Sequence, residues 1–134
     1  MVEGRFPRSF DSLAAISTLI DGFAVRENMS PDISFDLQLA VEELFTNLVK
    51  HHPESREPIL LQLERVPDGV RVTLEDFGVE PWDIAEAVAT ARAPLPDQGP
   101  GGRGLRLVRL ITDEIRYQHD RGHSTITLIK KVDT

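Results

Sequence analysis

Apolar residues recur at two different spacings along the chain, and the first of these predicts helices. One helix is expected between a cap at Ser9 or Asp11 and an end near Asn28, because its apolar residues stand three or four positions apart. A second is expected from Pro31, which a first helical turn tolerates, to just before Pro53. The two apolar stripes are Leu13, Ile16, Ile20 and Phe23, followed by Leu37, Val41, Leu44 and Leu48. A third helix is expected over about residues 104–112.

Alternation of apolar and polar residues predicts strands elsewhere. An edge strand is expected within residues 1–8. Two strands are expected around the turn Pro67-Asp68-Gly69, and two more, over 114–119 and 123–131, around the turn Asp120-Arg121-Gly122. A short helix is expected at 83–91. Residues 93–104 hold several prolines and glycines, and we expect them to form a functional loop or a lid.

The order of these elements indicates the class of fold. Strands come in adjacent pairs joined by short turns, which favours a mostly antiparallel, mixed sheet. The helices then pack on one face of it. We therefore expect a two-layer α+β sandwich that forms a single domain over residues 1–134.

Composition narrows the classes of function. The chain has 134 residues and a formal net charge of -7, which argues against direct binding to nucleic acid. It has no cysteine, so disulfides and thiolate chemistry are excluded. No apolar run is long enough to span a bilayer and no signal peptide is visible. We expect a cytoplasmic protein without a membrane partner.

Glu43, Asn47 and His51 are four residues apart and therefore share one face of the second helix. An asparagine oxygen is a hard, neutral ligand that suits Mg²⁺, and a glutamate one turn earlier can act as a base. The alternative is an ordinary solvated helix face.

Asp76 is in phase with the apolar residues of its strand, which is an unusual place for a carboxylate without a partner. A carboxylate there can accept a hydrogen bond from an exocyclic amine such as that of adenine, and Gly78 permits close approach of a flat ring. The alternative is a simple turn after a strand.

A glycine-rich run, Gly99-Pro-Gly-Gly-Arg-Gly104, leads into the third helix. Glycines at the start of a helix can present amide donors to phosphate. The run lacks the Gly-Lys-Ser/Thr ending of a P-loop, and a flexible loop is the alternative.

Taken in order, these three motifs resemble those of the GHKL (Bergerat-fold) ATPase superfamily, and in particular its anti-sigma-factor serine/threonine kinases. Residues 39–51 look like the N box of that family, 76–83 like its first glycine box and 101–109 like its second. The resemblance covers nearly the whole chain.

The resemblance implies ATP and Mg²⁺ as cofactors and a role for each matching residue. Asn47 would bind Mg²⁺ and Glu43 would be the general base. Asp76 would read adenine, with Gly78 against the base. Phosphate or ribose would be contacted by the remaining candidates, which are Lys50, His51, Gly101, Gly102, Arg103 and Gly104. Residues 93–103 would form the ATP lid.

The resemblance also implies a protein partner, an anti-sigma-factor antagonist of the STAS type, and a sigma factor or similar partner switch, with a possible homodimer. The chain departs from the family pattern in places. Arg103 stands where a hydrophobic residue is common, and Pro100 stands near the place of a frequent arginine. The chain is therefore expected to be a protein kinase or, alternatively, a nucleotide-gated binding module with little or no kinase activity.

Overall fold

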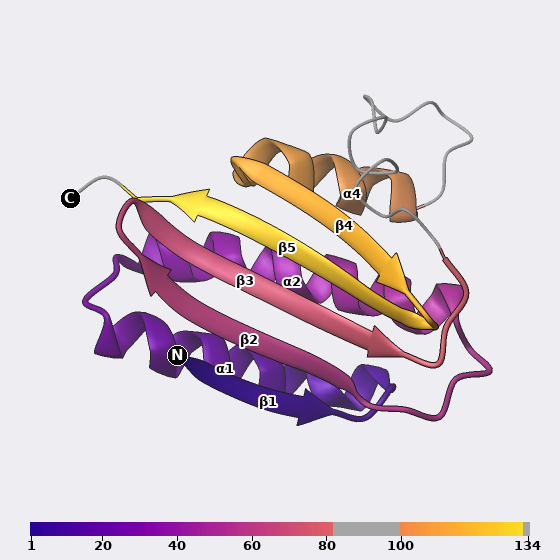
Figure 1. Cartoon of the computed structure of the whole chain (residues 1–134). Coiled ribbons are helices and arrows are strands. Elements are labelled where there is room, and N and C mark those ends of the chain that lie inside the picture. The colour runs from indigo at the N-terminus through magenta and orange to yellow at the C-terminus, as the bar shows by residue number, and fades with distance from the viewer. Residues whose placement is uncertain (82–99, 133–134) are drawn as a thin grey trace.

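A five-stranded antiparallel sheet forms one layer of the molecule (Figure 1). The computed structural model describes residues 1–81 and 100–132. The strands are β1 (Val2–Phe6), β2 (Ile59–Val66), β3 (Gly69–Phe77), β4 (Glu114–Asp120) and β5 (His123–Lys131). Their order in the sheet is β1-β2-β3-β5-β4. Every neighbouring pair in this sheet is antiparallel, so the mixed character that we expected is absent from it.

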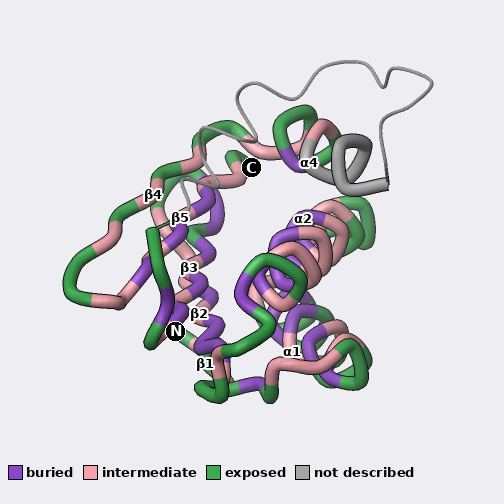
Figure 2. Tube along the Cα trace, turned by 90° about the vertical axis from the view of Figure 1, so that its right-hand side faces the viewer, coloured by how far each residue is buried: buried purple, intermediate pink, exposed green. Residues whose placement is uncertain are grey.

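The helices form the second layer, on one face of the sheet, as Figure 2 shows. They are a 3-10 turn, η1 (Phe10–Ser12), and the α-helices α1 (Leu13–Arg26), α2 (Pro31–His51) and α4 (Pro100–Ile111). The two-layer α+β prediction is confirmed. Within the described ranges, no helix has both the length and the apolar character that crossing a membrane requires.

Capping explains where the first two helices begin. The Ser9 hydroxyl oxygen accepts a hydrogen bond from the Asp11 amide at 3.2 Å, but it caps η1, and α1 begins only at Leu13. The Ser30 hydroxyl oxygen accepts from the Ile33 amide at 3.3 Å, and Pro31 is the first residue of α2, as its fixed φ favours.

The third predicted helix begins four residues earlier than expected. α4 starts at Pro100, and it ends at Ile111 rather than Thr112. The glycines at 101, 102 and 104 therefore lie in a helix and not in an irregular loop. A proline lacks an amide hydrogen and has a helical φ, which makes position 100 a natural first residue.

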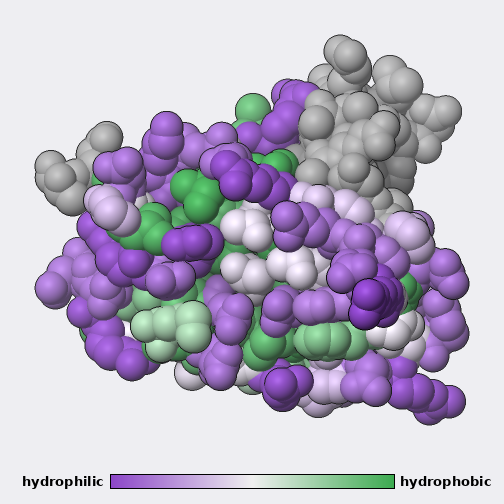
Figure 3. All heavy atoms as spheres, viewed as in Figure 1, coloured by the Kyte–Doolittle hydropathy of each residue, from purple (hydrophilic) through white to green (hydrophobic). Residues whose placement is uncertain are grey.

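The hydrophobic core lies between the sheet and the helices. Both predicted helical stripes point into it, since every member except the partly buried Leu13 is buried. The sheet contributes alternate residues, among them Leu61, Leu74 and Ile126. The opposite face of the sheet carries mostly hydrophilic residues with smaller apolar areas between them (Figure 3). Val108 extends the core under α4.

Two tight turns fix the registers of the hairpins. Val66 pairs with Gly69 across the first turn, and a Cβ at position 69 would collide with the Lys130 carbonyl oxygen of β5. In the second turn Arg121 and Gly122 have φ values of 52° and 78°. Positive φ at both central residues is the mark of a type I′ hairpin turn, which matches the twist of the strands.

Candidate functional site

Three of the segments that carry motifs meet at one end of the molecule. In Figure 1 the end of β3, the end of α2 and the beginning of α4 lie at the same end. α2 and α4 pack against each other. This end therefore gathers parts of the three motifs that are far apart in sequence.

Glu43 and Asn47 lie one turn apart on α2, and both are half-buried. The Asn47 Nδ2 atom donates a hydrogen bond to the Glu43 backbone carbonyl oxygen at 2.6 Å. That bond occupies the amide's donor side and leaves Oδ1 as the atom that can coordinate a cation.

The neighbouring carboxyl of Glu42 has a raised pKa, first because of burial and then because of the negative charge of Glu43. Adjacent helical positions diverge by about 100°, so the two carboxylates do not form a pair on one face.

Asp76 is the most buried carboxylate of the site, with 1% of its surface exposed. Its Oδ1 atom accepts a hydrogen bond from the Arg8 guanidinium, whereas Oδ2 is buried and has no hydrogen-bond partner among the described residues. Burial raises the pKa of Asp76, and the nearby Arg8 charge opposes this rise. A buried acceptor oxygen without a donor among residues 1–81 and 100–132 can accept a hydrogen bond from an amine of a ligand.

Arg8 was not singled out by the sequence analysis. Its Nη1 atom donates to the Leu48 carbonyl oxygen at 3.2 Å, and its Nε atom donates to the Glu57 carbonyl oxygen at 3.4 Å. The unusual position of Asp76 signalled that a partner was needed. It did not identify Arg8, because the two residues are 68 positions apart in the chain.

Gly78 has a φ of +68°, a conformation that side chains with a Cβ rarely adopt. The turn is held by the β4–β5 hairpin: the Val79 amide donates to the Gly122 carbonyl oxygen at 3.0 Å, and His119 Nε2 lies 2.9 Å from the Val79 carbonyl oxygen. The backbone conformation alone therefore favours a glycine here.

Lys50 and His51 lie in the last turn of α2, with both side chains exposed. Burial, followed by the nearby charge of His52, lowers the pKa of His51. The next residue, His52, is buried and closes the helix, and its amide donates to the Leu48 carbonyl oxygen at 3.0 Å. His52 is a second residue near Asp76 that the sequence analysis missed.

The glycine-rich run contributes the first turn of α4. Backbone amides at the start of a helix have no partner within it, so those of Gly101 and Gly102 are the ones suited to an anion. Gly104 lies farther in, where its amide faces the carbonyl of Pro100. Arg103 lies in the same turn. Residues 82–99, with most of the expected lid and the short helix expected at 83–91, lie outside the described residues.

The residues of α2 fit Mg²⁺ of the kind that nucleotides carry. Within residues 1–81 and 100–132, no group of three or more histidine, cysteine or carboxylate side chains could hold a metal ion by itself. Mg²⁺ in phosphate-transfer sites is typically held by few protein groups, with phosphates and waters supplying the other ligands. The single oxygen that Asn47 offers suits such a site.

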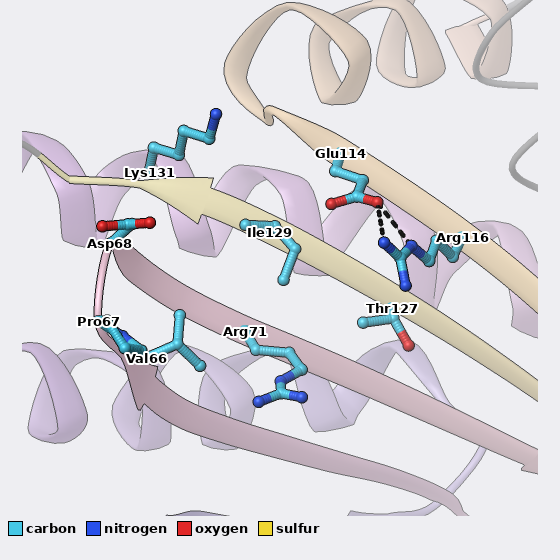
Figure 4. A pocket seen from close by; sticks show the side chains of 9 residues that line it. All are labelled: Val66, Pro67, Asp68, Arg71, Glu114, Arg116, Thr127, Ile129 and Lys131. Atoms are coloured by element: carbon cyan, nitrogen blue, oxygen red, sulfur yellow. Dashed lines mark hydrogen bonds and ion pairs between the residues drawn. The ribbon is translucent and has the colours of Figure 1, made fainter.

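A pocket on the outer face of the sheet is not part of this site. It measures about 420 Å³ and is lined by residues such as Asp68, Arg71, Arg116 and Lys131 (Figure 4). It lies beside the turn that precedes β3, whereas Asp76 lies near the end of that strand. The pocket and the motifs therefore occupy opposite ends of the sheet.

Known proteins match the chain over most of its length. Residues 6–130 match the family model of the histidine kinase-like ATPase domain. The serine/threonine-protein kinase BtrW of Bordetella bronchiseptica is 31% identical over 115 residues, which cover 81% of this chain and 78% of BtrW. The serine-protein kinase RsbW of Staphylococcus epidermidis is 30% identical over 140 residues, which cover 98% of this chain and 86% of RsbW.

A solved structure confirms the fold independently. A chain of the crystal structure of the SiaB-SiaC complex from Pseudomonas aeruginosa superposes with a TM-score of 0.70 at 15% identity, covering 96% of this chain and 88% of that one. At this identity the likeness concerns the arrangement of helices and strands.

Proposed function

Because the chain belongs to the histidine kinase-like ATPase domain family, we propose that it is an ATP-dependent serine/threonine protein kinase of the anti-sigma-factor type. It transfers the γ-phosphoryl group of ATP to a serine or threonine of a small antagonist protein and so regulates a sigma factor or a similar partner switch. Relatives named serine-protein kinase support the reaction class.

One observation carries the proposal. The buried Asp76 carboxylate keeps an oxygen without a partner among the described residues. Asp76 stands near the end of β3, and β3 ends on the same side of the fold as α2, the helix that carries Glu43 and Asn47 (Figure 1). A nucleotide site needs an acceptor for the amine of the nucleobase, which Asp76 would provide. It also needs groups at the phosphates, which would be the carboxylate of Glu43 and the side-chain amide of Asn47. The backbone amides in the first turn of α4 would donate hydrogen bonds to the phosphates.

The proposed reaction assigns a role to each group. The substrate hydroxyl oxygen forms a bond to the γ-phosphorus, the bond from this phosphorus to the β–γ bridging oxygen breaks, and ADP leaves. Glu43 accepts the proton of the hydroxyl group. Asn47 would hold Mg²⁺, which neutralises charge on the phosphates when bound. Lys50, His51 and Arg103 would contact the phosphates or the ribose.

The proposed partner is an antagonist of the STAS type, because that is the substrate class of the kinases that this chain resembles. A homodimer and a cytoplasmic location belong to the same proposal. The first test is phosphotransfer from labelled ATP to this antagonist in the presence of magnesium. Tight ATP binding with no transfer to the cognate antagonist would refute the kinase assignment.

An Asn47→Ala variant adds a second test. It is expected to lose phosphotransfer, whereas Thr46→Ala, which alters the adjacent α2 position on a different face, is expected to retain it.

The alternative is a nucleotide-gated binding module. Pro100, which starts α4 near the place of the arginine found in related kinases, favours it. In that case partner binding would respond to ATP and ADP differently, and Asn47→Ala would leave partner binding intact.

A further inference from the structure

The Arg8 guanidinium joins three segments around Asp76. It donates to the carboxylate on β3, to the Leu48 carbonyl near the end of α2, and to the Glu57 carbonyl before β2. Its side chain is only 6% exposed. The two backbone acceptors hold the guanidinium in place beside the carboxylate.

This contact makes the two oxygens of Asp76 unequal. Oδ1 accepts from Arg8, while Oδ2 is buried and accepts no hydrogen bond from the described part of the chain. A carboxylate held through one oxygen cannot rotate freely, so the direction in which Oδ2 offers its lone pairs is set by Arg8. The acceptor is therefore oriented in advance of binding, which reduces the ordering cost of the ligand complex.

We propose that Arg8 is a positioning residue for base recognition, which orients Asp76 and thereby makes the site selective for purines with a 6-amino group. The inference rests on the proposed ATP site and names a residue that sets its specificity. Arg8 itself contacts Asp76 and the backbone, and it acts on the nucleotide only through that carboxylate.

The chemistry of the base edge explains the selectivity. An ionised carboxylate only accepts hydrogen bonds, so Oδ2 pairs with the amine donor of adenine and opposes the carbonyl oxygen of guanine. Asp76 must stay ionised for this. Burial raises its pKa, and the groups that oppose this rise are Arg8, His52 and the Phe77 backbone amide. On β5, the residue paired with Asp76 is the uncharged Ser124.

A purely structural role for Arg8 makes a different prediction. A cation at the end of α2 stabilises that helix, and its loss would then weaken binding of all purine nucleotides by a similar factor. A positioning role instead weakens discrimination for the amino group. These two cases are separated by the ratio of the affinities for a purine nucleotide with the 6-amino group and for one without it. Damage to the fold weakens the binding of both nucleotides equally and therefore cancels in this ratio.

The experiment titrates the full chain with ATP and with purine riboside triphosphate, which lacks only the 6-amino group. Wild type is expected to bind ATP about 10- to 100-fold more tightly, as for a hydrogen bond to a charged group. In Arg8→Gln this ratio is expected to fall to within about threefold of unity, as in Asp76→Asn. Arg71→Gln, which removes an exposed arginine on β3, is the matched control and is expected to keep the wild-type ratio.

Two results would overturn the inference while ATP binding stands: an unchanged ratio in Arg8→Gln, or no discrimination by the wild type. If wild type binds neither nucleotide, the proposed function fails as well. Should Arg8→Gln not fold, Arg8→Lys keeps the charge without the planar fork that reaches both carbonyls. A wild-type ratio in folded Arg8→Lys would also overturn the inference, and a ratio at least about threefold lower would support it.

Discussion

The buried pair Arg8–Asp76 allows a quantitative prediction about stability. Both side chains are almost fully buried, with 6% and 1% exposed. Removing one member of such a pair typically costs about 3–5 kcal/mol, because the other charge stays buried without compensation. We therefore expect Asp76→Leu to lower the free energy of unfolding by about that amount. Arg8→Met is expected to cost less, since Asp76, whose pKa burial already raises, can escape its charge by protonation.

The double variant Arg8→Met/Asp76→Leu is expected to be more stable than the sum of the single changes implies. It leaves no buried charge at this place, and its remaining cost is the loss of the two hydrogen bonds to backbone carbonyl oxygens, about 1 kcal/mol each or less. The Leu48 carbonyl oxygen keeps the His52 amide as a donor. The coupling free energy between the two positions should therefore amount to about 2 kcal/mol or more.

Wild type, the two single variants and the double variant form a double-mutant cycle. Chemical denaturation at pH 7, followed by circular dichroism and fitted to a two-state transition, measures the free energy of unfolding of all four proteins. The exposed pair Arg71–Glu64, 3.5 Å apart on the outer face of the sheet, gives a matched cycle in which the coupling should stay below about 1 kcal/mol. If the changes at Arg8 and Asp76 add to within about 0.5 kcal/mol, the reasoning about a buried, mutually dependent pair is wrong.

Three further predictions concern single residues. Glu43→Gln should lower the phosphotransfer rate about 10²- to 10⁴-fold as the loss of a general base would, with ATP affinity in equilibrium titration nearly unchanged; a rate near that of wild type would exclude this role. Gly78→Ala should lower the free energy of unfolding by about 1–2 kcal/mol because of its positive φ, and an unchanged denaturation midpoint would contradict this. Because folding raises the pKa of Asp76 from 3.8, its contribution to stability is fully present below that value and is lost as the pH rises through the folded pKa. The free energy of unfolding of wild type, relative to that of Asp76→Asn, should therefore fall as the pH rises from 3.8 through the folded pKa. If the difference between the two proteins does not change with pH, the raised pKa of Asp76 is refuted.

The periodic features of the fold could be predicted from the sequence because they depend on local chemistry. The spacing of Ile16, Ile20 and Phe23 requires a helix whose stripe faces a core, and the alternation around Leu61 and Leu74 requires a strand. Asp76 was expected to point inward for the same reason, and it is buried. Residues that follow a period could thus be placed without knowledge of their neighbours.

The partners of those residues could not be predicted in the same way. Arg8 follows no period, and its contacts with Leu48, Glu57 and Asp76 depend on how distant segments pack. The predicted start of α4 near Gly104 is also wrong, because a proline can begin a helix and Pro100 brings the glycines that follow it into α4. A single sequence shows which groups need a partner more readily than it shows which partner they find.

The position of β5 has a consequence for the order in which the molecule can assemble. This strand is the last in chain order, yet it lies inside the sheet between β3 and β4, and Ser124 pairs with Asp76. A nascent chain that ends before it leaves one edge of β3 unpaired and lacks the Gly122 carbonyl that holds the turn at Val79. The end of the molecule that is proposed to bind the base thus depends on contacts between the beginning, the middle and the end of the described chain, which are slow to form. A ribosome-bound intermediate would accordingly remain unable to bind nucleotide until the segment through Lys131 has left the exit tunnel.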